Sequence, residues 1–116
     1  MATRRSNQAG RRAVRGSSTG RPIMVLFDAL GRRWSLRVLW ELRAGRLNFR
    51  ALQERCAEIS PTVLNARLKE LRILELVDHD DGGYGLTDWG RELGEELMAL
   101  SDFASRWDAA RRRDDE

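Results

Sequence analysis

The sequence has few of the side chains that usually carry catalysis or bind metals. Its 116 residues include one cysteine, Cys56, and one histidine, His79. A single cysteine excludes an internal disulfide framework, and neither residue has partners at the spacing of a zinc site. The sequence also has no glycine-rich phosphate loop. We therefore expect a protein that is not an enzyme and that needs no metal or cofactor.

Long apolar runs are missing as well. No stretch approaches the ~18 uncharged apolar residues that a membrane-spanning helix needs. The basic N-terminus is not followed by the apolar run of a secretory signal. The composition, 41% hydrophobic and 34% charged, suits one soluble domain whose helices have charged outer faces. The sequence therefore predicts a cytoplasmic protein that does not contact a membrane.

The positive charge is unevenly distributed. The net charge is +3, but residues 1–21 contain six arginines and no acid, which leaves 15 basic against 18 acidic residues in the remainder. Glycine and serine interrupt any apolar periodicity here, so we expect a disordered basic tail. Two interpretations stay open: an arm that binds DNA phosphate or lies in a minor groove, and a solvated leader that adds only solubility.

Apolar residues recur at helical spacing from Pro22 onward. The spacing predicts helices over residues 22–30 and 35–43, each ended by a glycine. The second helix is apolar on more than one side, which is typical of a buried helix. We expect both of the neighbouring tryptophans, Trp34 and Trp40, to lie in the core.

Two capped helices are expected next. Asn48 is a suitable N-cap for a short helix whose inward face includes Cys56, which we expect to be a small buried hydrophobe. Ser60-Pro61 is the clearest helix start, since serine accepts a bond from a free N–H and proline has no N–H to leave unpaired. The helix over residues 61–74 buries Leu64, Leu68 and Leu71. Its outward residues are Thr62, Asn65, Ala66 and Lys69.

The periodicity changes after Glu75. Residues 76–79 and 84–87 are expected to be strands of a hairpin, with the glycines of Asp80-Asp81-Gly82-Gly83 supplying positive φ in the turn. Thr87 is expected to cap a long final helix with a coiled-coil-like apolar seam. The seam residues are Leu93, Leu97, Leu100, Ala104 and Trp107. Residues 111–116 are expected to form a frayed, solvated end.

This order predicts a winged helix-turn-helix fold, mainly α with a small β-hairpin wing, over residues 22–110. In such folds one helix crosses the DNA backbone and the next enters the major groove. Asn65 can pair with adenine, and Thr62 suits a base edge or a thymine methyl. Arg67 and Lys69 offer charge to guanine or phosphate. The other expected DNA contacts are Ser60, Arg32, Arg33 and His79.

Three segments resemble HxlR-type winged helix-turn-helix regulators, relatives of the MarR group. They are Gly31-Arg32-Arg33-Trp34, the Ser-Pro-x-Val-Leu and Arg-Leu-x-x-Leu motifs within residues 60–71, and residues 84–90. The resemblance covers residues 21–108 and implies a cytoplasmic homodimer whose first and last helices form the interface. It also implies that Thr62, Asn65 and Arg67 lie at the DNA. The expected dimer contacts are Ile23, Phe27, Leu93, Leu97, Leu100 and Trp107.

The chain departs from the family pattern in three places. Many members carry a sensing cysteine immediately before the proline that opens the first helix, where this chain has Arg21. The wing is short and holds Asp78, Asp80 and Asp81 where the family is generally basic, and acids repel phosphate. Asn48 occupies a place where a basic residue often precedes the phenylalanine.

A second class of function stays open. The acidic wing and the net negative domain are compatible with a protein-interaction module of the same fold that binds DNA weakly or not at all. Steep salt dependence of binding to random duplex would distinguish a DNA-binding protein from such a module. An unknown small-molecule effector also stays open, with Trp89 and Trp107 either filling the dimer interface or lining a pocket between protomers.

Overall fold

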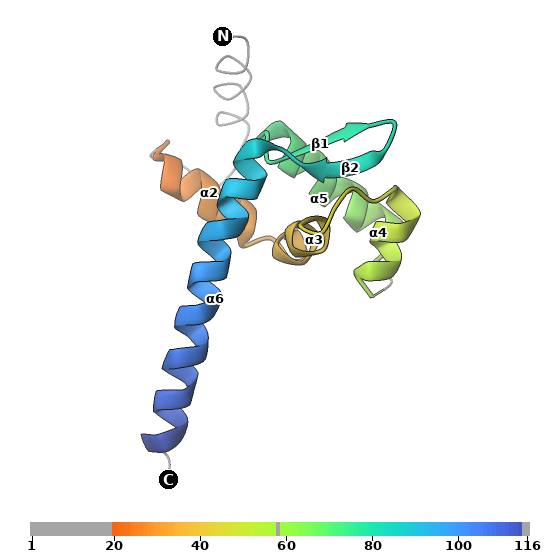
Figure 1. Cartoon of the computed structure of the whole chain (residues 1–116). Helices are drawn as coiled ribbons and strands as arrows, with labels where there is room; N and C mark the ends of the chain where they lie inside the picture. Colours follow the sequence, from red (N-terminus) through yellow and green to blue (C-terminus); the bar gives the residue numbers. More distant parts are fainter. Residues whose placement is uncertain (1–19, 58, 115–116) are drawn as a thin grey trace.

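The computed structural model describes residues 20–57 and 59–114 (Figure 1). The expected basic tail falls almost entirely outside these residues. The order of elements confirms the predicted fold class, mainly α with one antiparallel hairpin. The elements are α2 (Pro22–Leu30), α3 (Ser35–Leu42), α4 (Phe49–Arg55), α5 (Pro61–Ile73), β1 (Val77–Asp80), β2 (Gly83–Leu86) and α6 (Asp88–Asp114).

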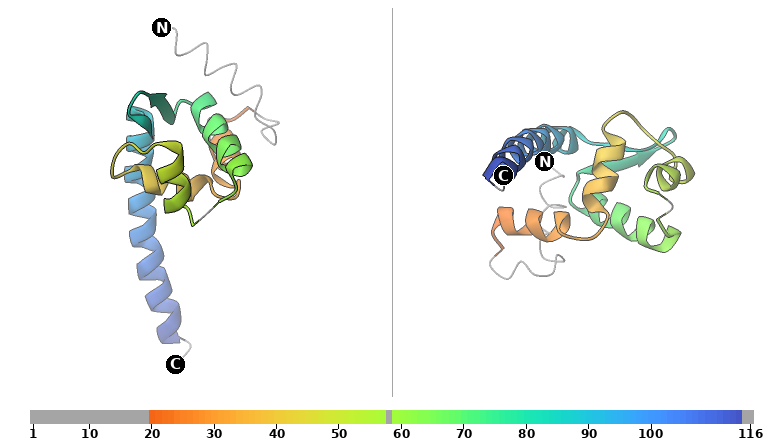
Figure 2. Two further views of the ribbon diagram at one scale, coloured as in Figure 1. Left: turned by 90° about the vertical axis from the view of Figure 1, so that its right-hand side faces the viewer. Right: turned by 90° about the horizontal axis from the view of Figure 1, so that it is seen from below.

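Helix α3 lies at the centre of the molecule and packs against α2, α4, α5, α6 and β2. Seen from below, α2 and α6 lie on one side of it, whereas α4, α5 and the hairpin lie on the other (Figure 2). The fold therefore separates a helix-turn-helix unit with its wing from a pair of outer helices. A single apolar core around α3 joins the two parts.

The core residues confirm the central place of α3 but correct one expectation about it. Val38, Leu39 and Leu42 are buried, and Trp34 packs partly buried against the core. Trp40, however, is 43% exposed and was expected in the core. An eight-residue helix buries one face against the helix-turn-helix unit, and Trp40 lies on the face turned toward α6, where a groove remains.

All three predicted N-caps are confirmed. Each cap satisfies a backbone N–H of the first turn that has no partner within its helix. The starts of α4, α5 and α6 are thereby fixed by local chemistry. The bonds run from Ala51 N to Asn48 Oδ1 (2.8 Å), from Val63 N to Ser60 Oγ (3.2 Å) and from Gly90 N to Thr87 Oγ1 (3.0 Å).

The hairpin pairs Val77 with Leu86 at its base and Asp80 with Gly83 at its tip. Among the turn glycines, positive φ occurs at Gly83 (107°) and not at Gly82, which corrects the expectation that both supply it. Leu47 extends this small sheet, since its N–H and carbonyl exchange hydrogen bonds with Tyr84 at 3.0 and 2.8 Å. The wing is thus attached to the segment just before α4.

Helix α6 is 27 residues long, about 40 Å at 1.5 Å per residue, and its C-terminal half projects away from the rest of the molecule (Figure 1). Residues 111–114 continue the helix, which differs from the expected frayed end. Arg111 and Arg112 both donate to the Asp108 carboxylate one turn earlier, which supports this last turn. Within residues 20–57 and 59–114, no helix is long and apolar enough to cross a membrane.

Candidate nucleic-acid interface

Helix α5 is held in the fold by one apolar face. Leu64, Leu68 and Leu71 are each at most 1% exposed and lie in the core. On the opposite side, Thr62, Asn65 and Lys69 are exposed, as the sequence predicts. Across the described part of the chain, no side-chain hydrogen bond or ion pair engages any of these three residues. Their donors and acceptors are therefore free to meet a ligand.

Arg67 does not share that free face. Its side chain is 13% exposed, and its Nε lies 3.3 Å from Glu70 Oε1. Its Nη1 donates to the carbonyl of Arg33 at 3.4 Å. An arginine held in this way has little surface left for base edges or phosphate. The placement of Arg67 does not support its expected contact with DNA.

Arg32 and Arg33 lie in the turn between α2 and α3, next to α5. Arg32 Nη2 is 3.2 Å from Glu70 Oε2, so this arginine pairs with α5. The guanidinium of Arg33 lies 5.6 Å from the centre of the Trp34 ring. Ser60 is exposed at the start of α5, where its hydroxyl already accepts the capping bond. Contact of these residues with DNA stays a prediction.

Lys69 and His79 line an open hollow of about 510 Å³ between α5 and β1. The hollow also contains Arg72, which sequence analysis did not single out, and Ile73. Arg72 follows Lys69 by three residues and therefore lies on the same side of the helix, a signal that was available. His79 is exposed and its ring lies 4.3 Å from that of Tyr84 on the paired strand. Lys69, Arg72 and His79 thus line one hollow between the helix and the wing, together with the acidic residues Glu75 and Asp78.

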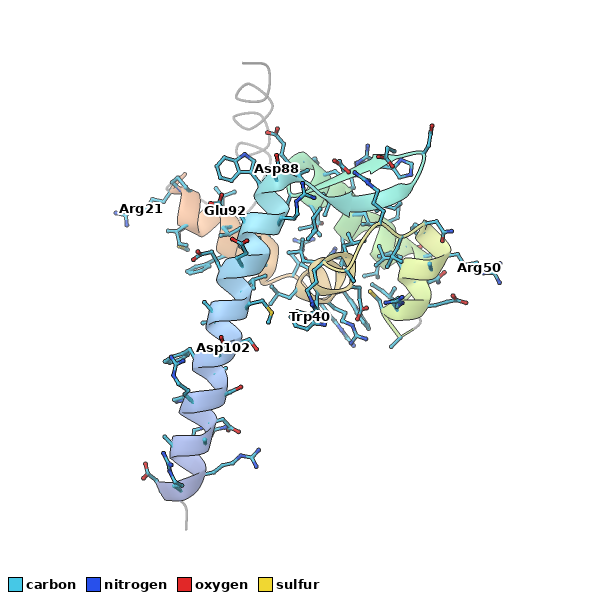
Figure 3. All side chains as sticks on the ribbon, viewed as in Figure 1. Arg21, Trp40, Arg50, Asp88, Glu92 and Asp102 are labelled. Atoms are coloured by element: carbon cyan, nitrogen blue, oxygen red, sulfur yellow. The ribbon has the colours of Figure 1, made fainter. Side chains whose placement is uncertain are left out.

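Arg50 is a second residue that the sequence analysis missed. It is exposed in the first turn of α4, and its side chain points away from the molecule (Figure 3). In a helix-turn-helix, the first helix crosses the DNA backbone. The signal in the sequence was its position two residues after the Asn48 cap.

The acidic wing carries its own counterion. Arg46 extends along the hairpin, where it pairs with Asp78, lies 3.4 Å from Asp80 Oδ2 and donates to the Gly83 carbonyl at 2.9 Å. A Cβ at Gly85 would lie 2.8 Å from Arg46 Cγ, so the absence of a side chain there gives the arginine its place. The wing is consequently less negative than its sequence indicates, and Asp81 is the acid without this partner.

A large apolar surface lies on α2 and α6, away from the wing. Phe27 on α2 is 57% exposed, and Leu100 and Trp107 on α6 are 60% and 52% exposed. Two of the expected dimer residues are less available, because Leu93 packs against the core and Leu97 lines the groove beside α3. Phe103 is 51% exposed and was missed, although it continues the spacing from Leu100 to Trp107. Ile23 is also exposed on α2.

The apolar groove between α3 and α6 has a volume of about 290 Å³. Trp40 forms part of its wall, with the Arg43 guanidinium 3.7 Å from the centre of the indole. Figure 3 shows Trp40 at the edge of α3. Gly94 leaves the α6 side of the groove open, since a Cβ there would meet nothing within 4 Å. The groove is apolar enough for a small hydrophobic molecule or another helix.

Cys56 is fully buried, as expected. Burial raises the pKa of its thiol above the ordinary value, and the Glu41 carboxylate adds to this rise, while Arg37 opposes it. A buried, protonated thiol is a poor nucleophile. In the described ranges, no three histidine, cysteine or carboxylate side chains are grouped as metal ligands.

The comparisons with known proteins agree with this geometry. A model of the HxlR-like helix-turn-helix family matches residues 29–112. The HTH-type transcriptional regulator YvaP of Bacillus subtilis strain 168 is 31% identical over 87 residues, which span 69% of this chain and 81% of YvaP. The family match thus includes α3, the helix-turn-helix, the wing and most of α6.

Solved structures give the same result. Quinone-bound YodB from B. subtilis is 30% identical with a TM-score of 0.69, and the match covers 72% of this chain and 96% of YodB. A MarR-family regulator from Enterococcus faecalis V583 is 21% identical with a TM-score of 0.73 over 87% of this chain and 98% of its own. The second match shows a shared fold.

Proposed function

Because the chain belongs to the HxlR-like helix-turn-helix family of transcriptional regulators, we propose that it binds a specific duplex DNA sequence as a homodimer, with α5 in the major groove. The observation that carries this proposal is the exposed polar face of α5. Thr62, Asn65 and Lys69 present free hydrogen-bonding groups on a helix whose other side is buried in the core. The major groove admits one helix, and its base edges are read by such groups.

We assign each exposed residue a different part of the contact. Asn65 reads a base, because its amide can donate and accept toward adenine. Thr62 lies one turn earlier and meets a base edge or a thymine methyl. Lys69, Arg72 and His79 face the DNA backbone from the hollow between α5 and β1. Ser60 supports the contact indirectly, since it fixes the first turn of α5.

The apolar surface on α2 and α6 supports the proposed homodimer. A monomer would leave Phe27, Leu100, Phe103 and Trp107 each more than half exposed. Clustered surfaces of this kind mark interaction sites. A symmetric dimer predicts a roughly palindromic DNA site with half-sites about one or two helical turns apart.

Selection of duplexes from a random pool, followed by titration across salt concentrations, tests DNA binding. We expect a recovered palindrome and a log affinity that falls steeply with log salt, by about 0.9 per phosphate contact. Recovery of no preferred sequence, together with weak and salt-independent binding, would favour the alternative of a protein-interaction module.

Light scattering at micromolar concentration tests the dimer. We expect twice the chain mass for the wild type and dissociation for Leu100→Asp, because a buried unpaired charge is unfavourable at an apolar interface. Glu95→Asp, an exposed change on α6 that retains the charge, is the control. A monomeric wild type would contradict the proposed interface.

The quinone in the YodB structure supports the expectation of a small-molecule effector for this chain. The groove between α3 and α6 is the place we propose for it, because Trp40 and the leucines of α6 line it. A thiol adduct is not proposed, since Arg21 stands before Pro22 and Cys56 is buried. Quenching of Trp40 fluorescence by an added quinone, lost in Trp40→Leu, would be the expected signature.

A further inference from the structure

A partly buried polar side of α5 joins this helix to the turn that follows α2. We call this contact the turn–helix bridge, and it consists of Arg67 and Glu70 on α5 with Arg32 and the Arg33 carbonyl in the turn. Glu70 lies between two guanidinium groups, 3.2 Å from Arg32 Nη2 and 3.3 Å from Arg67 Nε. Arg67 also donates to the Arg33 carbonyl at 3.4 Å. Two side chains of the helix therefore hold two consecutive residues of the turn.

Burying the Arg67 guanidinium in this contact costs desolvation free energy. The Arg67 side chain is largely buried, and its Nε is fully buried without a well-aligned hydrogen bond. Burying a charged group is unfavourable unless it is paired, and a buried ion pair is weak evidence for stability. An apolar side chain would cover the same surface with less desolvation. Unlike an apolar contact, the ionic contact is directional, so it fixes the orientation of α5 relative to the turn.

The turn ends in an unusual backbone conformation. Trp34 ends it with φ of 81°, in the left-handed region that a bulky residue seldom adopts, while its ring packs against the core. The residues before the turn form α2, which carries the exposed Ile23 and Phe27. The turn–helix bridge is thus a polar contact between the recognition helix and the end of a helix in the proposed dimer interface.

We propose that Arg67 and Glu70 are positioning residues, which set the orientation of α5 relative to α2 and so the separation of the two recognition helices in the dimer. This inference rests on the proposed function. Arg67 and Glu70 would then determine which half-site spacing is bound, without contacting DNA. Residues that read bases determine the half-site sequence instead.

The preference for one half-site spacing is measured as the ratio of affinities for the selected operator and for operators with one base pair added or removed between the half-sites. One base pair turns a half-site by about 35° and moves it by about 3.4 Å. In Arg67→Met, which keeps an unbranched apolar stem and removes the guanidinium with its charge, we expect the preference for one spacing to fall roughly 2- to 30-fold, the range of coupling through packed networks. The preferred half-site bases stay the same.

Three companion variants separate positioning from other roles. Arg67→Lys retains the charge beside Glu70 and should recover part of the spacing preference. Arg32→Ala removes only the half-exposed pair, so it tests the bridge even if Arg67→Met does not fold. Combined with Glu70→Gln, Arg32→Ala should add little, because both break the same pair. Arg113→Met in the last turn of α6 is the control and should leave the spacing preference unchanged.

Other outcomes would overturn the inference. An unchanged spacing ratio in folded Arg67→Met and in Arg32→Ala would show that the bridge does not set the separation. A salt slope reduced by about 0.9 with the ratio intact would make Arg67 a phosphate contact. A changed preference at one base would make it a base contact. If the wild type selects no duplex, the proposed function fails, and this result differs from every bridge outcome.

Discussion

Helix α5 and the wing lie side by side, but their charged side chains differ in whether they are paired within the protein. On α5 the exposed residues Asn65 and Lys69 are unpaired within the described chain, whereas the ionic groups that are paired lie on its buried side. On the wing, Asp78 and Asp80 face the solvent together with the arginine that neutralises them. The polar groups on the exposed face of α5 are thus available to a ligand, whereas Asp78 and Asp80 of the wing are already paired with Arg46.

The difference teaches that arginine content does not measure the charge available to DNA. Arg46, Arg67 and Arg32 all lie in the helix-turn-helix region, and all three are engaged by carboxylates. Among the described residues, the basic side chains of this region that no carboxylate engages include Arg50, Lys69 and Arg72. The structure therefore keeps Lys69 among the proposed phosphate contacts, adds Arg50 and Arg72, and disfavours Arg67.

Gly83→Ala gives the largest effect expected from this comparison, because it breaks the wing and leaves α5 intact. A Cβ at Gly83 would lie 2.5 Å from the Leu47 carbonyl oxygen, and its φ is 107°. We expect a loss of roughly 2–4 kcal/mol in the free energy of unfolding, from overpacking and from the positive φ. Gly94→Ala is the matched control, since its Cβ meets nothing within 4 Å and alanine favours the helix. Urea denaturation measures both, and equal stability of the two variants would contradict the described attachment of the wing.

Ser60→Ala tests the start of the recognition helix. It removes the hydroxyl that accepts from Val63 N, and loss of such a cap costs about 1 kcal/mol. The exposed Ser105→Ala within α6 should instead be neutral or slightly stabilising. Thermal unfolding of the two variants gives the comparison, and a Ser60→Ala protein as stable as Ser105→Ala would refute the capping role.

The double variant Asp78→Asn/Asp80→Asn is expected to have the smallest effect, and it tests whether the paired charges of the wing keep Arg46 from DNA. With both acids neutral, Arg46 becomes available, and we expect tighter binding to every duplex with a salt slope steeper by about 0.9. Glu95→Gln with Glu96→Gln changes the net charge equally on α6 and is the control. Identical slopes for the two double variants would mean that the wing stays away from the DNA backbone.

The sequence predicts the local parts of this structure well. The caps at Asn48, Ser60 and Thr87 depend on bonds within a few residues, and each is confirmed. The outward direction of Asn65 also follows from helical spacing around the buried leucines. These features need no knowledge of distant contacts.

What the sequence did not predict depends on distant partners. Arg67 pairs with a carbonyl 34 residues away and Arg46 with an acid 32 residues away. Trp40 has the residue type of a core position, yet it lies at the groove between α3 and α6 and is 43% exposed. The exposed Phe103 was missed because the predicted apolar seam of the last helix placed Ala104, and not Phe103, between Leu100 and Trp107. Each error concerns which neighbour a side chain meets after folding.

The central claim is that Asn65 reads a base from the major groove. Titration of wild type and Asn65→Ala with the selected operator and with a scrambled duplex tests it most directly. We expect Asn65→Ala to fold normally and to lose roughly 1–3 kcal/mol on the operator, with almost no change on the scrambled duplex. Lys69→Ala, in contrast, should weaken both duplexes alike. Equal loss on both duplexes for Asn65→Ala, or no loss on either, would contradict the assignment of α5 as the recognition helix.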